Sequence, residues 1–245
     1  MDFQAGEVLY INKPLHWTSF DVVNKIRILL RNHLGIRKIK VGHAGTLDPL
    51  ATGLVIVCTG RATKRIEEFM GQEKEYVATI KFGETTPSFD LESTVDGVYP
   101  FEHVTQADLE AMIAERFLGE IEQVPPVFSA VKLNGKRAYD LARQGQEVEM
   151  KSRMVTIHSI AIESFELPYV VLRIRCGKGT YIRSLARDLG VAMASGAHLV
   201  KLVRTRIGEW TLRESVFLAE LGGQLEALKA LDEPTAPDNG EVVEP

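Results

Sequence analysis

Three stretches of this chain alternate polar and apolar residues, and this alternation constrains the fold more than any other feature. They are residues 76–82, 154–163 and 170–176. A period of two indicates strands with one buried face and one open face. Strands of a doubly wound parallel sheet are buried on both faces and are more uniformly apolar. The sequence therefore predicts an α+β fold with a mixed, largely antiparallel sheet flanked by helices.

Helical patterns are interspersed irregularly with these strands. Thr18 and Thr105 each precede an acid by three residues and then a run of apolar residues at helical spacing, which is typical of a capped helix N-terminus. Residues 180–189 predict another helix, for which Gly190 is placed as a C-terminal stop. Two shorter helices are predicted at residues 138–143 and 224–231.

The chain has no internal repeat and no Pro- or Ser-rich linker before residue 213. We therefore expect residues 1–213 to form one domain and residues 214–232 to form a short helical extension. Residues 233–245 contain three prolines and no aromatic residue, which predicts a disordered acidic tail.

Charge is unevenly distributed along the chain. The net charge is −4, but residues 214–245 hold eight acids and one base, so that segment carries −7 and residues 1–213 carry +3. This distribution permits a polyanionic partner for the main domain without requiring one.

The composition is that of a soluble globular protein, with 45% hydrophobic and 25% charged residues. No apolar run is long enough to span a bilayer, and no signal peptide is evident at the N-terminus. Cys58 and Cys176 lie in predicted strands without a Cys-x-x-Cys spacing, so we interpret them as buried, reduced thiols. We expect a cytoplasmic protein without membrane contact.

A glycine-punctuated loop at residues 42–53 contains one carboxylate, Asp48, and leads directly into an apolar segment at residues 54–58. A loop held by a buried strand is well suited to present a reactive group. Asp48-Pro49 is also an ordinary turn signal, so the pattern by itself favours a structural turn. The loop is not a Walker-type phosphate loop, because no Gly-Lys-Ser/Thr closes it.

Arg183 lies in the first turn of the helix predicted at residues 180–189. A helix N-terminus carries partial positive charge, so an arginine there is unfavourable unless it faces a carboxylate. Asp48 is the candidate partner, because an ion pair would keep that acid ionised and oriented. A solvated arginine is the alternative. If the pair exists, we expect Arg183→Ala to reduce activity far more than stability.

Basic residues recur in several clusters. Each cluster by itself is more typical of a solvated face, but together they suggest phosphate contacts. They include Lys132, Lys136, Arg137 and Arg143; Arg173 and Arg175; Lys201, Arg204 and Arg206; and Arg27, Arg31, Arg37, Lys38 and Lys40. The six histidines are dispersed and lack the short spacing of a metal site, so no metal is expected. Tyr76 opens a strand, where an aromatic residue usually packs in the core.

Several separated motifs occur in one order along residues 7–213. They are Asn12-Lys13-Pro14 with Thr18-Ser19, the loop at residues 42–53, Lys74-x-Tyr76, residues 125–145, residues 178–190, Gly196-Ala197-His198 and Leu202-x-Arg204. In this combination the chain resembles the bacterial TruB-type tRNA pseudouridine synthases, which convert uridine 55 of the T-loop. The resemblance implies the mixed sheet flanked by helices that is typical of that family.

The resemblance also implies roles for individual residues. Asp48 matches the catalytic aspartate, and Arg183 matches the arginine paired with it. Tyr76 matches the tyrosine that stacks on the flipped base, and removal of a proton from C5 is a second hypothesis for Tyr76. His43, Tyr181 and Leu202 match residues that border the base. Lys132 is expected to contact the substrate. The family requires no cofactor, metal or guide RNA, and none is expected here.

The chain departs from the family pattern in three places. Gly177 replaces a frequent serine, and residues 86–90 read Thr-Pro-Ser-Phe-Asp. The residues after 213 are too few and too acidic for the C-terminal RNA-binding module of many members, so we expect a short form. The resemblance implies an isomerase that acts on the T-arm of tRNA without an obligatory protein partner. A non-catalytic tRNA-binding or tRNA-folding module, a nucleoside-processing enzyme and a guide-RNA-dependent relative are the alternatives.

Overall fold

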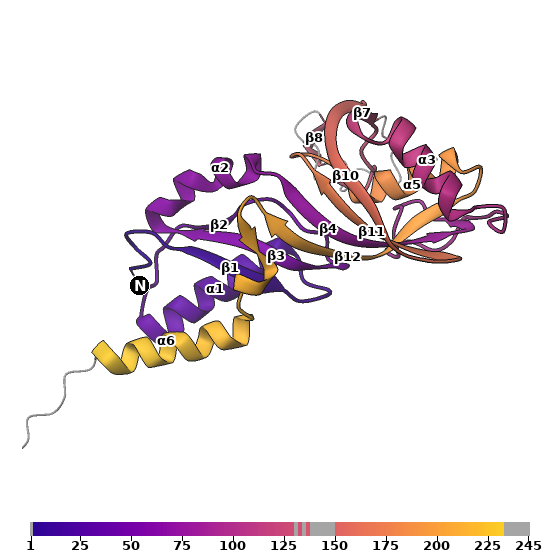
Figure 1. Ribbon diagram of the computed structural model, residues 1–245. Helices are drawn as coiled ribbons and strands as arrows, with labels where there is room; N and C mark the ends of the chain where they lie inside the picture. The colour runs from indigo at the N-terminus through magenta and orange to yellow at the C-terminus, as the bar shows by residue number, and fades with distance from the viewer. Residues whose placement is uncertain (1, 130–131, 134–135, 138–149, 233–245) are drawn as a thin grey trace, which may run out of the picture.

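A computed structural model describes residues 2–129, 132–133, 136–137 and 150–232 of the chain. Its main feature is a nine-stranded sheet with the order β1-β3-β12-β4-β11-β10-β7, to which β2 and β13 add at β3 and β12. Among the described strand pairs of this sheet, only β3 and β12 run parallel. The predicted mixed, largely antiparallel sheet is confirmed (Figure 1). The strands are β1 (Val8–Lys13), β2 (Val41–His43), β3 (Ala51–Thr59), β4 (Lys74–Phe82), β7 (Gly119–Gln123), β10 (Arg153–Glu166), β11 (Tyr169–Cys176), β12 (Ala197–Ile207) and β13 (Trp210–Thr211).

Two short hairpins lie outside the main sheet. One pairs β5 (Glu84–Thr85) with β6 (Gly97–Val98), and the other pairs β8 (Lys132–Leu133) with β9 (Lys136–Arg137). The helices are α1 (Ser19–Leu34), α2 (Ile66–Gly71), α3 (Gln106–Arg116), α5 (Ile182–Ala192) and α6 (Leu218–Asp232), with 3₁₀ turns η1 (Gly60–Arg65) and η2 (Leu212–Glu214).

The strand patterns follow from which faces the helices cover. In β4, buried and partly exposed residues alternate along the whole strand, as the sequence predicts. In β3 nearly every residue is buried, because Val55 and Val57 face the core on the α1 side while Leu54 and Ile56 pack with Phe69 of α2. The strand that follows the Asp48 loop is therefore held on both faces, which makes it a rigid support.

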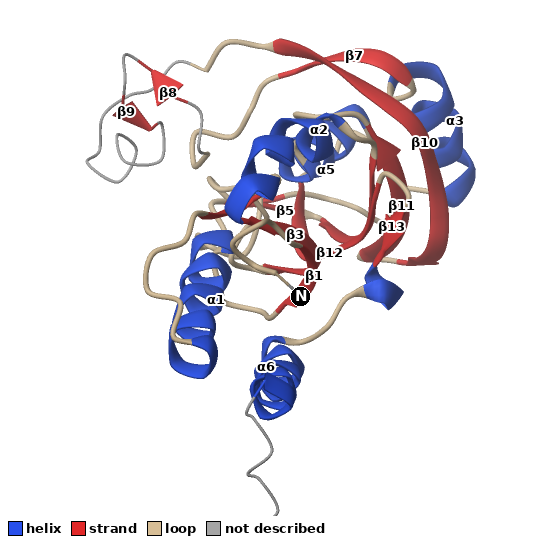
Figure 2. Cartoon of the chain, turned by 90° about the vertical axis from the view of Figure 1, so that its left-hand side faces the viewer, coloured by secondary structure: helices blue, strands red, loops and turns tan. Residues whose placement is uncertain are grey.

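Helices α1 and α6 lie side by side at one end of the molecule, whereas α3 and α5 lie at the other (Figures 1 and 2). Helix α1 begins with the predicted capping box, in which Thr18 and Asp21 exchange hydrogen bonds. Helix α6 contributes Leu218, Leu221 and Leu225 to the main hydrophobic core. It begins at Leu218 and includes Gly222 and Gly223, so the prediction of a helix starting at residue 224 was too short.

Helix α5 differs from its prediction in a way that affects the site. It begins at Ile182 and continues past Gly190 to Ala192, so Gly190 is not a helix stop. A Cβ at position 190 would lie 2.4 Å from the Ala197 backbone nitrogen. Glycine is needed there because α5 approaches the start of β12 too closely for a side chain.

Cys58 on β3 and Cys176 on β11 are buried and free, as expected, and burial raises the pKa of both thiols to about 11. Among the described residues, no helix is long and apolar enough to cross a membrane. The helix predicted at residues 138–143 and the tail at residues 233–245 lie outside the described residues.

Candidate active site

A cleft of about 530 Å³ opens near the middle of the sheet, between the Asp48 loop, β4, β12, the first residues of β10 and the turn from β11 into α5. We call it the central cleft. Five of the predicted site residues line it: Asp48, Tyr76, Tyr181, Arg183 and Leu202. They come from four separate segments of the chain, which the sheet order brings together.

The loop that carries Asp48 is anchored at several backbone positions. The Asp48 carbonyl accepts a hydrogen bond from the Ala51 amide at 3.0 Å, where β3 begins. Ser19, at the start of α1, accepts from the Leu47 amide at 2.9 Å through its hydroxyl. The buried Lys13 donates to the Pro49 carbonyl at 3.4 Å. Because these contacts surround Asp48, its backbone is held while its carboxylate stays one-third exposed.

Arg183 pairs with Asp48, as predicted. Its Nε donates to Asp48 Oδ2 at 2.9 Å, and the arginine side chain is only 4% exposed. A second acid, Asp90, has Oδ2 3.6 Å from the same Nε and is also buried. The remaining guanidinium nitrogens donate to the carbonyls of Ser88 at 3.2 Å and Phe128 at 2.9 Å. Arg183 is thus fixed in position, and so is the carboxylate that it meets.

Tyr76 lies on β4, directly opposite Ile174 of β11 and Arg204 of β12. It is 8% exposed and lines the central cleft. Burial raises the pKa of its hydroxyl, and the nearby Arg204 guanidinium opposes that rise. A phenol with a raised pKa is a poor proton acceptor near neutral pH, so the hypothesis that Tyr76 removes a proton from C5 is not favoured.

Tyr181 is the N-cap residue of α5. Its backbone is fixed by Gln123 of β7, whose side-chain amide accepts from the Tyr181 amide at 2.8 Å and donates to its carbonyl at 3.1 Å. The Arg153 guanidinium lies 4.6 Å from the centre of the Tyr181 ring. Leu202, on β12, supplies a buried apolar wall.

Two predicted residues are not among those that line the central cleft. His43 ends β2, where it pairs with Val57, and its Nδ1 is buried without a hydrogen-bond partner among the described residues. Burial, followed by the charge of Arg204, lowers the pKa of His43. Lys132 has a described backbone in β8, but its side chain lies outside the described part of the chain.

Sequence reasoning missed four polar side chains that support the site: Lys13, Lys74, Asp90 and Arg204 are all buried. Burial lowers the pKa of both lysines to about 8. The motifs Asn12-Lys13-Pro14, Lys74-x-Tyr76 and Leu202-x-Arg204 contain three of the four residues, and a basic residue within an apolar strand is the signal that could have identified them.

Several arginines expected to contact phosphate have other partners. On the outer face of the sheet, Arg173 meets Glu75 at 2.8 Å, and Arg175 and Arg206 meet Glu73 at 3.0 and 2.5 Å. Arg204 is buried and bonded to backbone carbonyls. A strand sequence does not show which acids lie on its neighbours, so these partners could not be predicted. Phosphate contact by these four residues stays a prediction.

Other cations remain exposed. Lys38, Lys40, Arg61 and Lys64 line a groove of about 360 Å³ beside η1, and none of them forms an ion pair with a described carboxylate. We call this the basic groove. Because η1 continues directly into α2, whose Glu67, Met70 and Gly71 line the central cleft, the basic groove and the cleft lie at opposite ends of one continuous segment.

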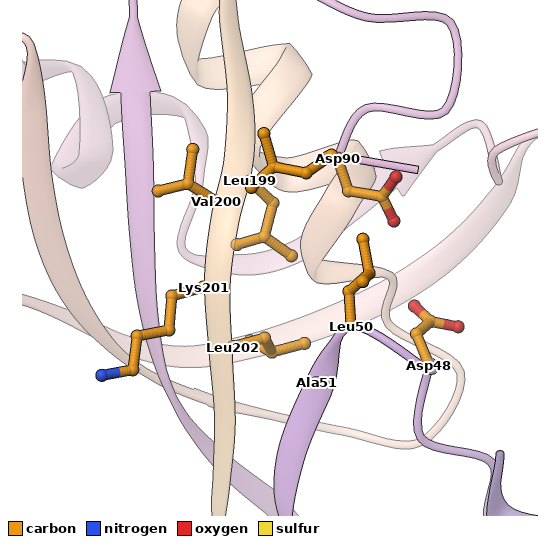
Figure 3. Close-up of a pocket in the computed structure, with 9 residues that line it drawn as sticks. Asp48, Leu50, Ala51, Asp90, Leu199, Val200, Lys201 and Leu202 are labelled. Atoms are coloured by element: carbon orange, nitrogen blue, oxygen red, sulfur yellow. The ribbon is translucent and has the colours of Figure 1, made fainter. Parts of the chain in front are cut away.

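A second, much smaller cavity of about 10 Å³ lies beside Asp48, with Leu50, Asp90, Leu199 and Leu202 among its lining residues. Figure 3 shows the Asp90 side chain above and the Asp48 side chain below, with Leu50 beside both. Its size matches that of one water molecule. The described residues contain no group of three or more His, Cys, Asp or Glu side chains that could hold a metal ion.

The family model described as TruB family pseudouridylate synthase (N terminal domain) matches residues 31–182, more than half of the chain. The chain belongs to the TruB family. The matched region includes the Asp48 loop, Tyr76 and Tyr181, and Arg183 is the residue that follows it. The tRNA pseudouridine synthase B of Parabacteroides distasonis is 63% identical over 86% of this chain and 90% of its own length. The enzyme of the same name from Phocaeicola vulgatus is 59% identical over 87% of this chain and 91% of its own length.

Solved structures agree with this assignment to the TruB family. A chain of a crystallised Cbf5-Nop10-Gar1 complex superimposes with a TM-score of 0.68 at 29% identity, over 90% of this chain. A chain of an H/ACA RNP bound to a substrate RNA superimposes with a TM-score of 0.64 at 26% identity, also over 90%. This TruB-family chain spans about half the length of those two chains, 54% and 53% respectively.

Proposed function

We propose that this protein converts uridine 55 in the T-loop of tRNA to pseudouridine. The observation that carries this proposal is the Asp48–Arg183 ion pair of 2.9 Å, which lies in a cleft also lined by Tyr76. A surface that only binds RNA needs neither a buried arginine on a carboxylate nor a cleft around it. The relatives named tRNA pseudouridine synthase B match along most of their length, which supports tRNA as the substrate.

The reaction breaks the bond from C1′ of the ribose to N1 of uracil, turns the base and joins C5 to C1′. A carboxylate assists either by attacking C1′ or by stabilising positive charge that develops on the sugar. Asp48 is partly exposed to the cleft, whereas its partner Arg183 is buried beneath it. Because the hydrogen bond from Arg183 holds the carboxylate in one orientation, Asp48 is positioned for either role.

The target uridine must leave the stacked T-loop before it reaches Asp48, and unstacking costs a few kcal/mol. Stacking on an aromatic side chain returns about 1–3 kcal/mol per base. Tyr76 is placed for this role, since it is the buried aromatic residue of β4 that lines the cleft. Tyr181 and Leu202 form walls that would exclude water and so protect the sugar from hydrolysis.

Two basic surfaces suit a tRNA phosphate backbone. The described residues that line the central cleft include five cations, Lys74, Arg153, Lys178, Arg183 and Arg204, against two acids, Asp48 and Glu67. The basic groove adds four exposed cations at the far end of η1. We propose that the cleft receives the T-loop and the groove contacts phosphates of a neighbouring part of the tRNA.

The test is to incubate the purified protein with unmodified tRNA and to map pseudouridine by position. We expect pseudouridine at position 55 without any added protein, guide RNA or metal, and none with the Asp48→Asn variant. Tight tRNA binding without product from the wild type would instead indicate a binding or folding module. Product that forms only after another component is added would indicate a guide-dependent or partner-dependent enzyme.

A further inference from the structure

Among the residues that line the central cleft is a buried cation that meets no carboxylate of the described part of the chain. Arg204 on β12 is 1% exposed, and no described carboxylate forms an ion pair with it. Arg183 and Arg206, in contrast, each meet an acid within 3 Å. Burying an unpaired charge costs several kcal/mol, so an uncompensated guanidinium in this position needs an explanation.

Within the described residues, neutral groups hold the guanidinium. Its Nε donates to the Leu54 carbonyl at 2.7 Å, and its two terminal nitrogens donate to the carbonyls of Thr46 and Gly45 at 3.3 Å each. These carbonyls satisfy the donors but do not cancel the charge. Two of them belong to the loop that carries Asp48, so Arg204 also fixes that loop against β12.

Arg204 lies next to the place where the base would sit. It is opposite Tyr76 in the β4–β12 register, and both residues line the cleft. The close approach of β3 to β12 depends on Gly53, where a Cβ would lie 2.4 Å from the Arg204 carbonyl oxygen. The charge of Arg204 also affects neighbouring groups. Burial is the largest cause of the lowered pKa values of Lys74 and His43, and the charge of Arg204 is the second largest.

We infer that Arg204 is a positioning residue that stabilises negative charge on the excised uracil, through the field of its unpaired guanidinium and through the Tyr76 hydroxyl. This inference rests on the proposed function. When the C1′–N1 bond breaks, its electron pair stays on the base, which then carries a negative charge shared between N1 and the ring carbonyls. The charge disappears when C5 bonds to C1′, C5 loses its proton and N1 gains one. A fixed cation in a site of low dielectric lowers the energy of such an anion.

The competing explanation is that Arg204 only anchors the loop. Two substitutions separate charge from hydrogen bonding: Arg204→Lys keeps the charge, and Arg204→Gln keeps neutral donors. We expect the single-turnover rate on unmodified tRNA to fall by less than about 10-fold for Arg204→Lys and by about 10²–10³-fold for Arg204→Gln, with the Kd for tRNA nearly unchanged. Equal or better activity of Arg204→Gln would overturn the inference.

A second measurement varies the base instead of the protein. Fluorine at C5 makes the uracil ring more acidic, so cleavage of 5-fluorouridine needs less stabilisation of the anion. Loss of 5-fluorouridine from the tRNA should therefore be slowed less by Arg204→Gln, relative to wild type, than conversion of uridine is. The same relative loss on both substrates would indicate a purely structural role. If Arg204→Gln does not fold, Arg204→Met, which also removes the charge, takes its place in this comparison.

The matched control is Arg206→Gln on the same strand, because Glu73 already neutralises that arginine. We expect its rate to stay within about 2-fold of wild type on both substrates. Failure of the proposed function itself is recognised separately, because the wild type would then form no pseudouridine at position 55.

Discussion

Asp48 and Arg183 are separated by 135 positions in the chain, yet Asp48 Oδ2 accepts a hydrogen bond from Arg183 Nε at 2.9 Å. The pair joins the loop before β3 to the first turn of α5, and both residues line the central cleft. Asp90 approaches the same nitrogen at 3.6 Å, so one arginine organises two carboxylates. The segment at residues 86–90, in which the chain departs from the family pattern, supplies both Asp90 and the Ser88 carbonyl that Arg183 binds.

The Asp48→Asn variant should lose at least about 10³-fold in turnover, because an amide neither attacks C1′ nor balances positive charge there. Since the side chain is one-third exposed and nearly isosteric, its tRNA affinity and melting temperature should stay close to those of the wild type. Pseudouridine mapping, tRNA titration and thermal unfolding measure the three quantities. Turnover equal to that of the wild type would remove Asp48 from the mechanism.

Substitution of Arg183 should affect stability as well as activity. The sequence favoured a loss of activity far greater than the loss of stability, but the arginine is buried, and its removal takes away the guanidinium nearest to the buried Asp90. We expect Arg183→Ala to lower the free energy of unfolding by about 3–5 kcal/mol and to abolish turnover. Urea denaturation beside single-turnover kinetics checks both effects, and Arg187→Ala, which removes a partly exposed arginine from the same helix, is the control. A stability equal to wild type would contradict the buried network.

Stability should rise as the pH increases from about 8 to 9. Burial lowers the pKa of Lys13 and of Lys74 to about 8, below the ordinary value of 10.5, so the unfolded chain binds more protons in this range. Each group contributes at most about 1.4 kcal/mol per pH unit. Above pH 9 the gain should level off, because Cys58 and Cys176 have pKa values raised to about 11 and act in the opposite direction.

Urea unfolding of the wild type and of Lys74→Met at several pH values between 7.5 and 10 measures this dependence. The variant should show roughly half the rise, since one of the two buried ammonium groups is gone. A wild-type stability that falls steadily from pH 8 to 9 would show that the two lysines do not titrate as their burial requires.

The basic groove should contribute affinity for tRNA but not chemistry. Neutralising Lys38, Lys40, Arg61 and Lys64 together should weaken tRNA binding at low salt. It should also reduce the slope of log K against log salt by roughly 0.7–0.9 for each phosphate that the variant no longer neutralises. The single-turnover rate at saturating protein should be unchanged. Arg116→Ala combined with Lys229→Ala removes charges elsewhere and is the control. An unaltered salt slope in the groove variant would exclude the groove from the interface.

Gly190→Ala should destabilise the protein, because the new Cβ would lie 2.4 Å from the Ala197 amide nitrogen and α5 would have to shift away from β12. We expect the free energy of unfolding to fall by about 1–3 kcal/mol, with reduced turnover since α5 also carries Arg183. Gly223→Ala is the matched control. A Cβ added at this position of α6 would meet no atom within 4 Å outside the adjacent helix backbone, so the substitution should be neutral or stabilising by up to about 1 kcal/mol. Denaturation curves that rank the two variants the other way would refute the close approach.

Local pattern was sufficient for much of the fold. Alternation in residues 76–82 and 170–176 predicts strands because the two faces of a strand point to different environments. The Thr18–Asp21 capping box predicts the start of α1 because it satisfies backbone groups within one turn. The end of α5 could not be predicted in this way, since the requirement for Gly190 comes from β12 and not from the helix itself.

The sequence by itself determined the kinds of strand and helix and the candidates Asp48 and Arg183, because short-range periodicity and residue chemistry are local properties. Tyr76 became a candidate only through the resemblance to the TruB family. Only the tertiary structure decided which charges meet. It paired Arg173, Arg175 and Arg206 with acids on neighbouring strands and left Arg204 buried without a carboxylate partner among the described residues. The field at a site depends on distances between segments remote in the chain, and those distances are set by sheet order and packing.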